Sequence, residues 1–113
     1  MKSYIAIAFL AFLFIACAEE TVEPKAAAML EMSRMHLSER RYNAARDSIL
    51  SLRRKYPTAI EERAQALLLL DSVEMLASQD SMKNAQGEEW KRLSVKAEFF
   101  QRKIEVDKKK LAK

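Results

Sequence analysis

The chain has 113 residues and a formal net charge of +4; half of its residues are apolar and 32% are charged. This length allows a single domain, and this mixture is typical of folded chains rather than disordered ones. The chain contains only one Gly and two Pro. Because sheets need frequent turns and phosphate-binding loops need glycines, the composition argues against both and favours long helices.

The N-terminal segment has the features of an export signal. Residues 4–15 (YIAIAFLAFLFI) carry no charge, follow Lys2 and lead into the small residues around Cys17. A positive start, a short apolar stretch and a small-residue exit are typical of a cleaved signal peptide, whereas a spanning helix needs about 20 apolar residues. The sequence therefore predicts a signal peptide over residues 1–16. A short membrane anchor that stays uncleaved remains the alternative.

Cys17 is the only cysteine, so no internal disulfide can form. Residues 14–17 (FIAC) resemble the lipobox of bacterial lipoproteins, although Phe14 stands where leucine is usual. The resemblance implies that the Cys17 thiol carries a diacylglyceryl group and that the mature chain is lipid-anchored in a membrane. Ala18 in place of aspartate implies the outer membrane. The acids Glu19 and Glu20 leave open whether the chain faces the periplasm or the cell surface.

The mature chain is predicted to begin with an acylated cysteine and a short polar linker over residues 17–23, followed by helices. The clearest helix carries one apolar stripe at Tyr42, Ala45, Ile49 and Leu52 and ends before Pro57. Such a stripe predicts that one side of the helix packs against its neighbours.

A third helix is predicted to start at Thr58, with Glu61 closing a capping box. Its apolar residues, which include the run Leu67–Leu70, cover most of the helix circumference. A helix of this kind is packed between neighbours. Residues 80–87 are the next predicted break.

A long amphipathic helix is predicted over residues 88–112, with apolar residues at heptad a and d positions and one polar defect at Asp107. These apolar residues are Trp90, Leu93, Ala97, Phe100, Ile104 and Leu111. Because so much apolar surface is not left exposed, we expect the stripe to pack on the leucine-rich helix of the same chain. Pairing with a second copy in a coiled coil is the alternative.

The segment RYNAARDSILSLRRKYP (residues 41–57) resembles the second helix of a tetratricopeptide repeat, and also the repeats of outer-membrane assembly lipoproteins. In this resemblance Tyr42 is the opening aromatic, Ala45 the small residue at the helix contact, Ile49 and Leu52 the packing residues and Pro57 the closing proline. The implied fold is all-α: a tetratricopeptide-like hairpin and a third helix over residues 24–86, then a long C-terminal helix over 87–113. A generic helical bundle stays open.

The sequence lacks the residues that most enzymes use. His36 is the only histidine and Cys17 is assigned to the lipid, so no nucleophile–base pair and no transition-metal site is predicted. We therefore expect no enzymatic activity and no cofactor, and export removes nucleic acid from the expected partners. The predicted function is a membrane-anchored helical adaptor for an unidentified envelope protein.

The alternative function is a structural tether that forms homo-oligomers through its C-terminal helix. In that case the basic segment 102–113 would contact a membrane or the cell wall. A solvated helix end, whose lysines complement the helix dipole, is the preferred interpretation of this segment.

Overall fold

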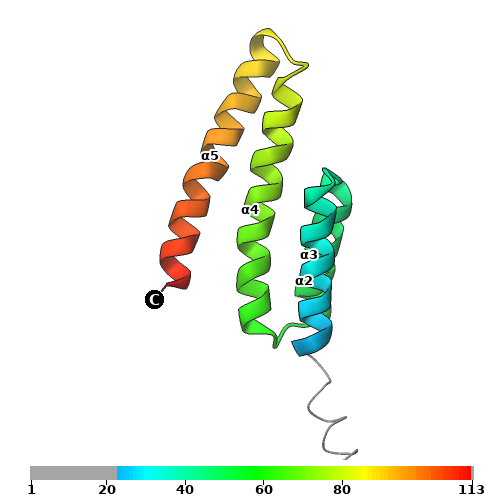
Figure 1. The fold of residues 1–113 in the computed structure, drawn as a ribbon. Coiled ribbons are helices and arrows are strands. Elements are labelled where there is room, and N and C mark those ends of the chain that lie inside the picture. The colour runs from blue at the N-terminus through cyan, green and yellow to red at the C-terminus, as the bar shows by residue number, and fades with distance from the viewer. Residues whose placement is uncertain (1–22, 113) are drawn as a thin grey trace, which may run out of the picture.

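The computed structural model describes residues 23–112, which form four helices joined by short turns (Figure 1). The helices are α2 (Glu23–Ser38), α3 (Tyr42–Lys55), α4 (Ile60–Met82) and α5 (Gly87–Leu111). Within this range there are helices and no strands, so the predicted all-α class is confirmed. The predicted signal peptide, the lipobox and Cys17 lie outside the described residues.

The helices are arranged around α4, which lies between the α2–α3 hairpin on one side and α5 on the other (Figure 1). In the described chain α4 contacts all three other helices, whereas α5 contacts only α4. This arrangement explains why the apolar residues of α4 cover so much of its circumference. The expectation that this helix is packed between neighbours is confirmed.

The main core lies where α2, α3 and α4 meet. Ala45, Ile49 and Leu52 of α3 are fully buried there, as the predicted apolar stripe requires. The core also contains Leu30 from α2 and Ala66 and Val73 from α4.

Two short turns define the hairpin and the start of α4. Arg40 has a φ of 61°, and the next N–H, of Arg41, donates to the carbonyl of His36 over 2.8 Å, which closes α2. α3 ends at Lys55 because the residue before Pro57 avoids the helical region, and Tyr56 accordingly has φ −124° and ψ 65°.

The predicted capping box at Thr58 is wrong. α4 begins at Ile60, and no side chain caps it. Residues 57–59 form the turn before the helix, so Thr58 lies one residue before the N-cap position, which Ala59 occupies. Arg63 donates from Nη1 to the carbonyl of Pro57 over 3.0 Å in this turn. Glu61 lies in the first turn, where a carboxylate interacts favourably with the helix dipole.

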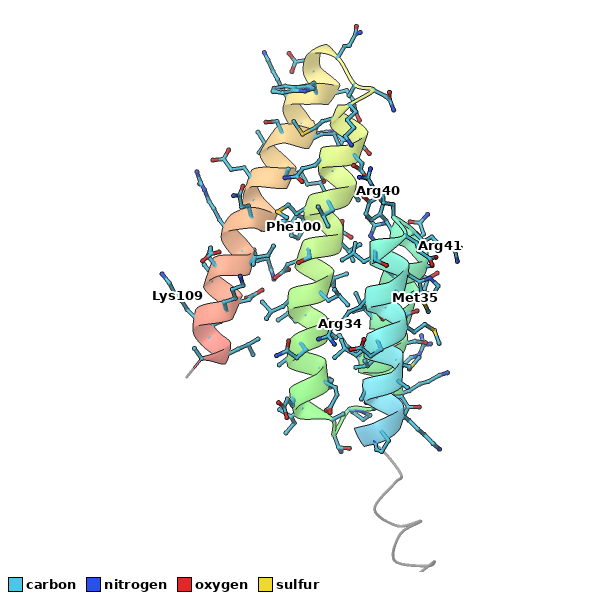
Figure 2. The ribbon with its side chains drawn as sticks, viewed as in Figure 1. Arg34, Met35, Arg40, Arg41, Phe100 and Lys109 are labelled. Carbon is cyan, nitrogen blue, oxygen red and sulfur yellow. The ribbon has the colours of Figure 1, made fainter. Side chains whose placement is uncertain are left out.

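The stripe of α5 packs on α4 of the same chain, as expected. Leu93 and Ala97 are buried, and Phe100 lies on the side of α5 that faces α4 (Figure 2). Burial is least at the two ends of the stripe, where Trp90 stays 45% exposed and Leu111 40% exposed. These two residues lie in the first and last turns of α5, where α4 alone is available to cover them.

We predict that Ala45→Leu destabilises the chain by about 1–3 kcal/mol, because Ala45 is fully buried in the core and added methylenes overpack it. Ala44→Leu, one residue further round the helix, is the matched control because Ala44 is only partly buried. Urea unfolding followed by circular dichroism measures both variants. Equal losses of stability would contradict this account of the α3 contact.

Candidate binding groove

A groove runs between α2 and α5 along the side of α4 that neither helix covers. It exists because α5 contacts α4 but not α2. Its volume is about 210 Å³. The lining residues come from three helices: Arg34 from α2, Gln65, Leu68, Leu69 and Ser72 from α4, and Ile104 and Lys108 from α5. We call this the α2–α5 groove.

The α2–α5 groove combines apolar side chains with two cations. Leu68, Leu69 and Ile104 are each only partly buried. Arg34, which lies between α2 and α4 in Figure 2, forms an ion pair with Glu31 on its own helix and with no other described residue. Lys108 forms no ion pair with any described residue. Because exposed ion pairs along one helix are weak, both cations stay available to a ligand.

A buried polar cluster fixes the α5 wall of this groove. The Nζ of Lys103 donates to Asp71 Oδ1 over 3.0 Å and to Asp107 Oδ2 over 2.7 Å. Asp71 is 2% exposed and Asp107 5% exposed. Buried carboxylates are costly unless they are paired, so α4 and α5 are held in the one register that places Lys103 between them.

The protonation of this cluster follows from its surroundings. Burial, then a hydrogen bond with Asp107, raises the pKa of Asp71 to about 6, against the opposing effect of Lys103. The same hydrogen bond, together with Lys103, lowers the pKa of Asp107. Of the two carboxyls, Asp71 is therefore the one that keeps its proton to higher pH.

A second polar link crosses the opposite side of α4. Arg46 of α3 is hydrogen-bonded to Glu74 of α4, and Lys96 of α5 lies 3.5 Å from the same carboxylate. Burial raises the pKa of Glu74, but Arg46 and Lys96 outweigh it, so this pKa lies below its usual value. Because α3 and α5 do not contact each other, Glu74 connects them through α4.

Near the end of α4, Tyr42 donates a hydrogen bond to Asp80, which is also 3.4 Å from Arg40 and 3.2 Å from Lys83. Burial and the Asp80 carboxylate raise the pKa of Tyr42, and the hydrogen bond lowers the pKa of Asp80. This contact ties the α2–α3 turn to α4. Tyr42 thus has a tertiary role beyond opening its helix.

The residues predicted to form the repeat packing do not line the groove. Ala45, Ile49 and Leu52 lie in the core, Tyr42 is partly buried beside it, and Pro57 is exposed in the turn before α4. Sequence reasoning missed the groove and the cluster beneath it.

A signal for the cluster was present in the sequence. Asp71 directly follows the leucine run, and Asp107 occupies a heptad d position. Both are charges on otherwise apolar helix faces, which is the pattern expected of a buried ion pair.

Residues 23–112 contain no group of three or more His, Cys, Asp and Glu side chains that could hold a metal ion. A membrane-spanning helix would need a longer apolar run than any helix in that range offers. No protein-family profile, curated protein or solved structure matches this chain.

We predict that the free energy of unfolding falls as the pH rises from about 4 to about 6. In this window the folded chain still binds the Asp71 proton that the unfolded chain has released, because the pKa is about 6 when folded and 3.8 otherwise. The upper limit of this fall is about 3 kcal/mol. The lowered pKa of Asp107 acts in the opposite direction, and only below about pH 4.

Urea unfolding at several pH values tests this prediction. Asp71→Asn should remove the fall between pH 4 and 6, because an amide does not titrate. Glu105→Gln, which removes an exposed carboxylate from α5, should leave the fall unchanged. A fall of the same size in Asp71→Asn would show that another group causes it.

Proposed function

We propose that this chain is a lipid-anchored adaptor of the bacterial cell envelope that binds another envelope protein in the α2–α5 groove. The observation that carries the proposal is the composition of that groove, with an apolar floor between one cation from α2 and one from α5. The ligand that fits is an amphipathic segment whose apolar side chains are flanked by carboxylates.

The fit follows from ordinary interface chemistry. Apolar ligand side chains would cover Leu68, Leu69 and Ile104 and release the water that these residues now expose. Carboxylates on either side would pair with Arg34 and Lys108, which have no partner on another helix within the described residues. The volume of about 210 Å³ admits only a few side chains, so the groove suits a short peptide segment.

Polar contacts on both sides of α4 hold the walls of the groove in place. Lys103 holds α5 to α4 on the side of the groove, and Glu74 holds α3 and α5 to α4 on the opposite side. A preorganised groove loses less conformational freedom when it binds, which favours affinity.

The anchoring part of the proposal rests on the sequence. The apolar segment 4–15, followed by FIAC, supports acylation at Cys17. Two or three acyl chains anchor a protein firmly, whereas one chain alone is marginal. An anchored adaptor would present its groove to partners close to the membrane, and the outer membrane is the one that we propose.

The alternative, a homo-oligomeric tether, has less support. Its interface would be the heptad stripe of α5, but Leu93, Ala97 and Phe100 of this stripe face α4 of the same chain. The mass in solution of residues 18–113 without the lipid distinguishes the two functions. A monomer agrees with the adaptor, and a stable dimer or trimer would favour the tether.

We predict that Cys17→Ala abolishes acylation and leaves either an uncleaved precursor or a soluble periplasmic protein. Metabolic labelling with a fatty-acid analogue measures the acylation directly. Label that survives on the variant would refute the lipid anchor, whatever the groove binds.

We predict that a photoreactive amino acid at Ser72, in the groove, forms a cross-link to one other envelope protein in cells. Arg34→Glu with Lys108→Glu should reduce this cross-link about tenfold, because both charges would then repel an acidic ligand. The matched control is Arg41→Glu with Lys83→Glu, which reverses two exposed cations away from the groove.

Three results bear on the groove. Loss of the cross-link in the groove variant but not in the control supports the proposal. Equal cross-linking in all three proteins would contradict it. An adduct with the mass of two copies of this chain would favour the tether.

A further inference from the structure

Four helix ends lie at the same end of the molecule. The start of α2, the α3–α4 connection and the end of α5 lie at this end, opposite the α4–α5 turn (Figure 1). Leu111 in the last turn of α5 lines a shallow hollow together with Ile60 and other residues from the start of α4. We call this the basal end: the first turns of α2 and α4, the last turns of α3 and α5, and residues 56–59.

The basal end is strongly basic. Its segments carry eight basic residues: Lys25, Arg53, Arg54, Lys55, Arg63, Lys108, Lys109 and Lys110. The sequence of the same segments holds three acids: Glu23, Glu61 and Glu62. None of the eight basic residues forms a salt bridge with another described residue, and Lys109 projects from α5 on the side away from α4 (Figure 2).

The opposite end has a different charge balance. Its turns and adjoining helix ends carry three basic residues (Arg40, Arg41, Lys83) and four acidic ones (Glu39, Asp80, Glu88, Glu89). All three of these cations are paired: Arg40 and Lys83 with Asp80, and Arg41 with Glu39. The molecule is therefore polarised along its length, with its unneutralised positive charge at the basal end.

Exposed apolar residues accompany this charge. Ile60 is 78% exposed and Leu111 is 40% exposed, and the hollow that they share has a volume of about 560 Å³. Glu61 and Glu62 also line this hollow, and the lysines and arginines lie on the neighbouring helix ends. Surfaces that dock on anionic lipid combine exposed apolar groups, which enter the headgroup region, with cations that contact phosphates.

We propose that the basal end docks on an anionic lipid surface and so holds the protein upright on the membrane. The proposal rests on the lipid anchor of the proposed function, because the anchor sets the distance. Six residue steps separate Cys17 from Glu23, so an acylated Cys17 lies at most about 20 Å from the start of α2 even if the chain is fully extended. The 23 residues of α4 span about 35 Å, so the opposite end would point away from the membrane.

The lysines at the ends of α3 and α5 also complement the dipoles of these helices. Stabilisation of the helix dipoles takes place within the protein, so by itself it predicts no dependence of membrane contact on lipid composition. A docking role predicts that the basal end approaches anionic bilayers, and that 1 M salt, with a Debye length of about 3 Å, releases it.

The experiment uses the mature chain as isolated from cell membranes, with Trp90→Phe and Leu111→Trp, which moves the only tryptophan to the basal end. It is mixed with vesicles of phosphatidylcholine alone or with about one third phosphatidylglycerol, each containing brominated lipid that quenches nearby indoles. We expect the quenching to be about twofold or more greater in the anionic vesicles and to fall in 1 M NaCl. The native chain, with Trp90 at the opposite end, should show no such difference.

A charge variant and its matched control identify the cause. Lys108→Glu, Lys109→Glu and Lys110→Glu together should reduce the quenching in anionic vesicles to the level seen in neutral ones. Lys83→Glu with Lys91→Glu, near the opposite end, should leave it unchanged. Circular dichroism checks that both variants keep their helices.

Flotation of the vesicles separates this proposal from the anchor. A chain that floats with both vesicle types but shows equal quenching in them is anchored without docking, which overturns the proposal. A chain that floats only with anionic vesicles docks without an anchor, so the basal surface stands and the acylation fails. Equal quenching in the charge variant and its control would also overturn the proposal.

Discussion

The ammonium group of Lys103 lies between the carboxyl groups of Asp71 and Asp107, and α5 depends on this contact more than on any other polar one. α5 contacts the described chain only through α4, and Lys103 fixes the register of these two helices at the level of the groove. The position of Ile104 and Lys108 on the groove wall follows from that register. An apolar α4–α5 contact would bury as much surface, but it would tolerate a slip along the helix far better.

Two sides of α4 lie between the α2–α3 hairpin and α5, and they differ in how the helices are linked across them. On one side, Glu74 links Arg46 and Lys96 across three helices. On the other side, no hydrogen bond or ion pair between the described residues joins α2 to α5, and this is the side that forms the groove. The carboxylate of Glu74 is thus used within the fold, whereas Arg34 and Lys108 remain available for a ligand.

The sequence predicted the elements that depend on local pattern. The stripe from Tyr42 to Leu52 and the stop before Pro57 placed α3 closely, because periodicity and proline stereochemistry act within a few residues. Asp107 is different: its partner Asp71 lies 36 positions earlier in the sequence, and only the register of the two packed helices brings the pair together. The groove could not be predicted for the same reason, since its walls come from helices that are not neighbours in the chain.

One consequence of the single contact made by α5 concerns partial opening of the native state. A helix that touches one neighbour can separate as a unit while the α2–α3–α4 core, with Ile49, Leu52 and Val73, stays intact. Such an opened form would present the bare flank of α4 and the stripe of α5 to solvent at the same moment. Two opened copies could then exchange their α5 helices, each covering the other's α4, so this fold contains the geometry for a domain-swapped dimer alongside the closed monomer.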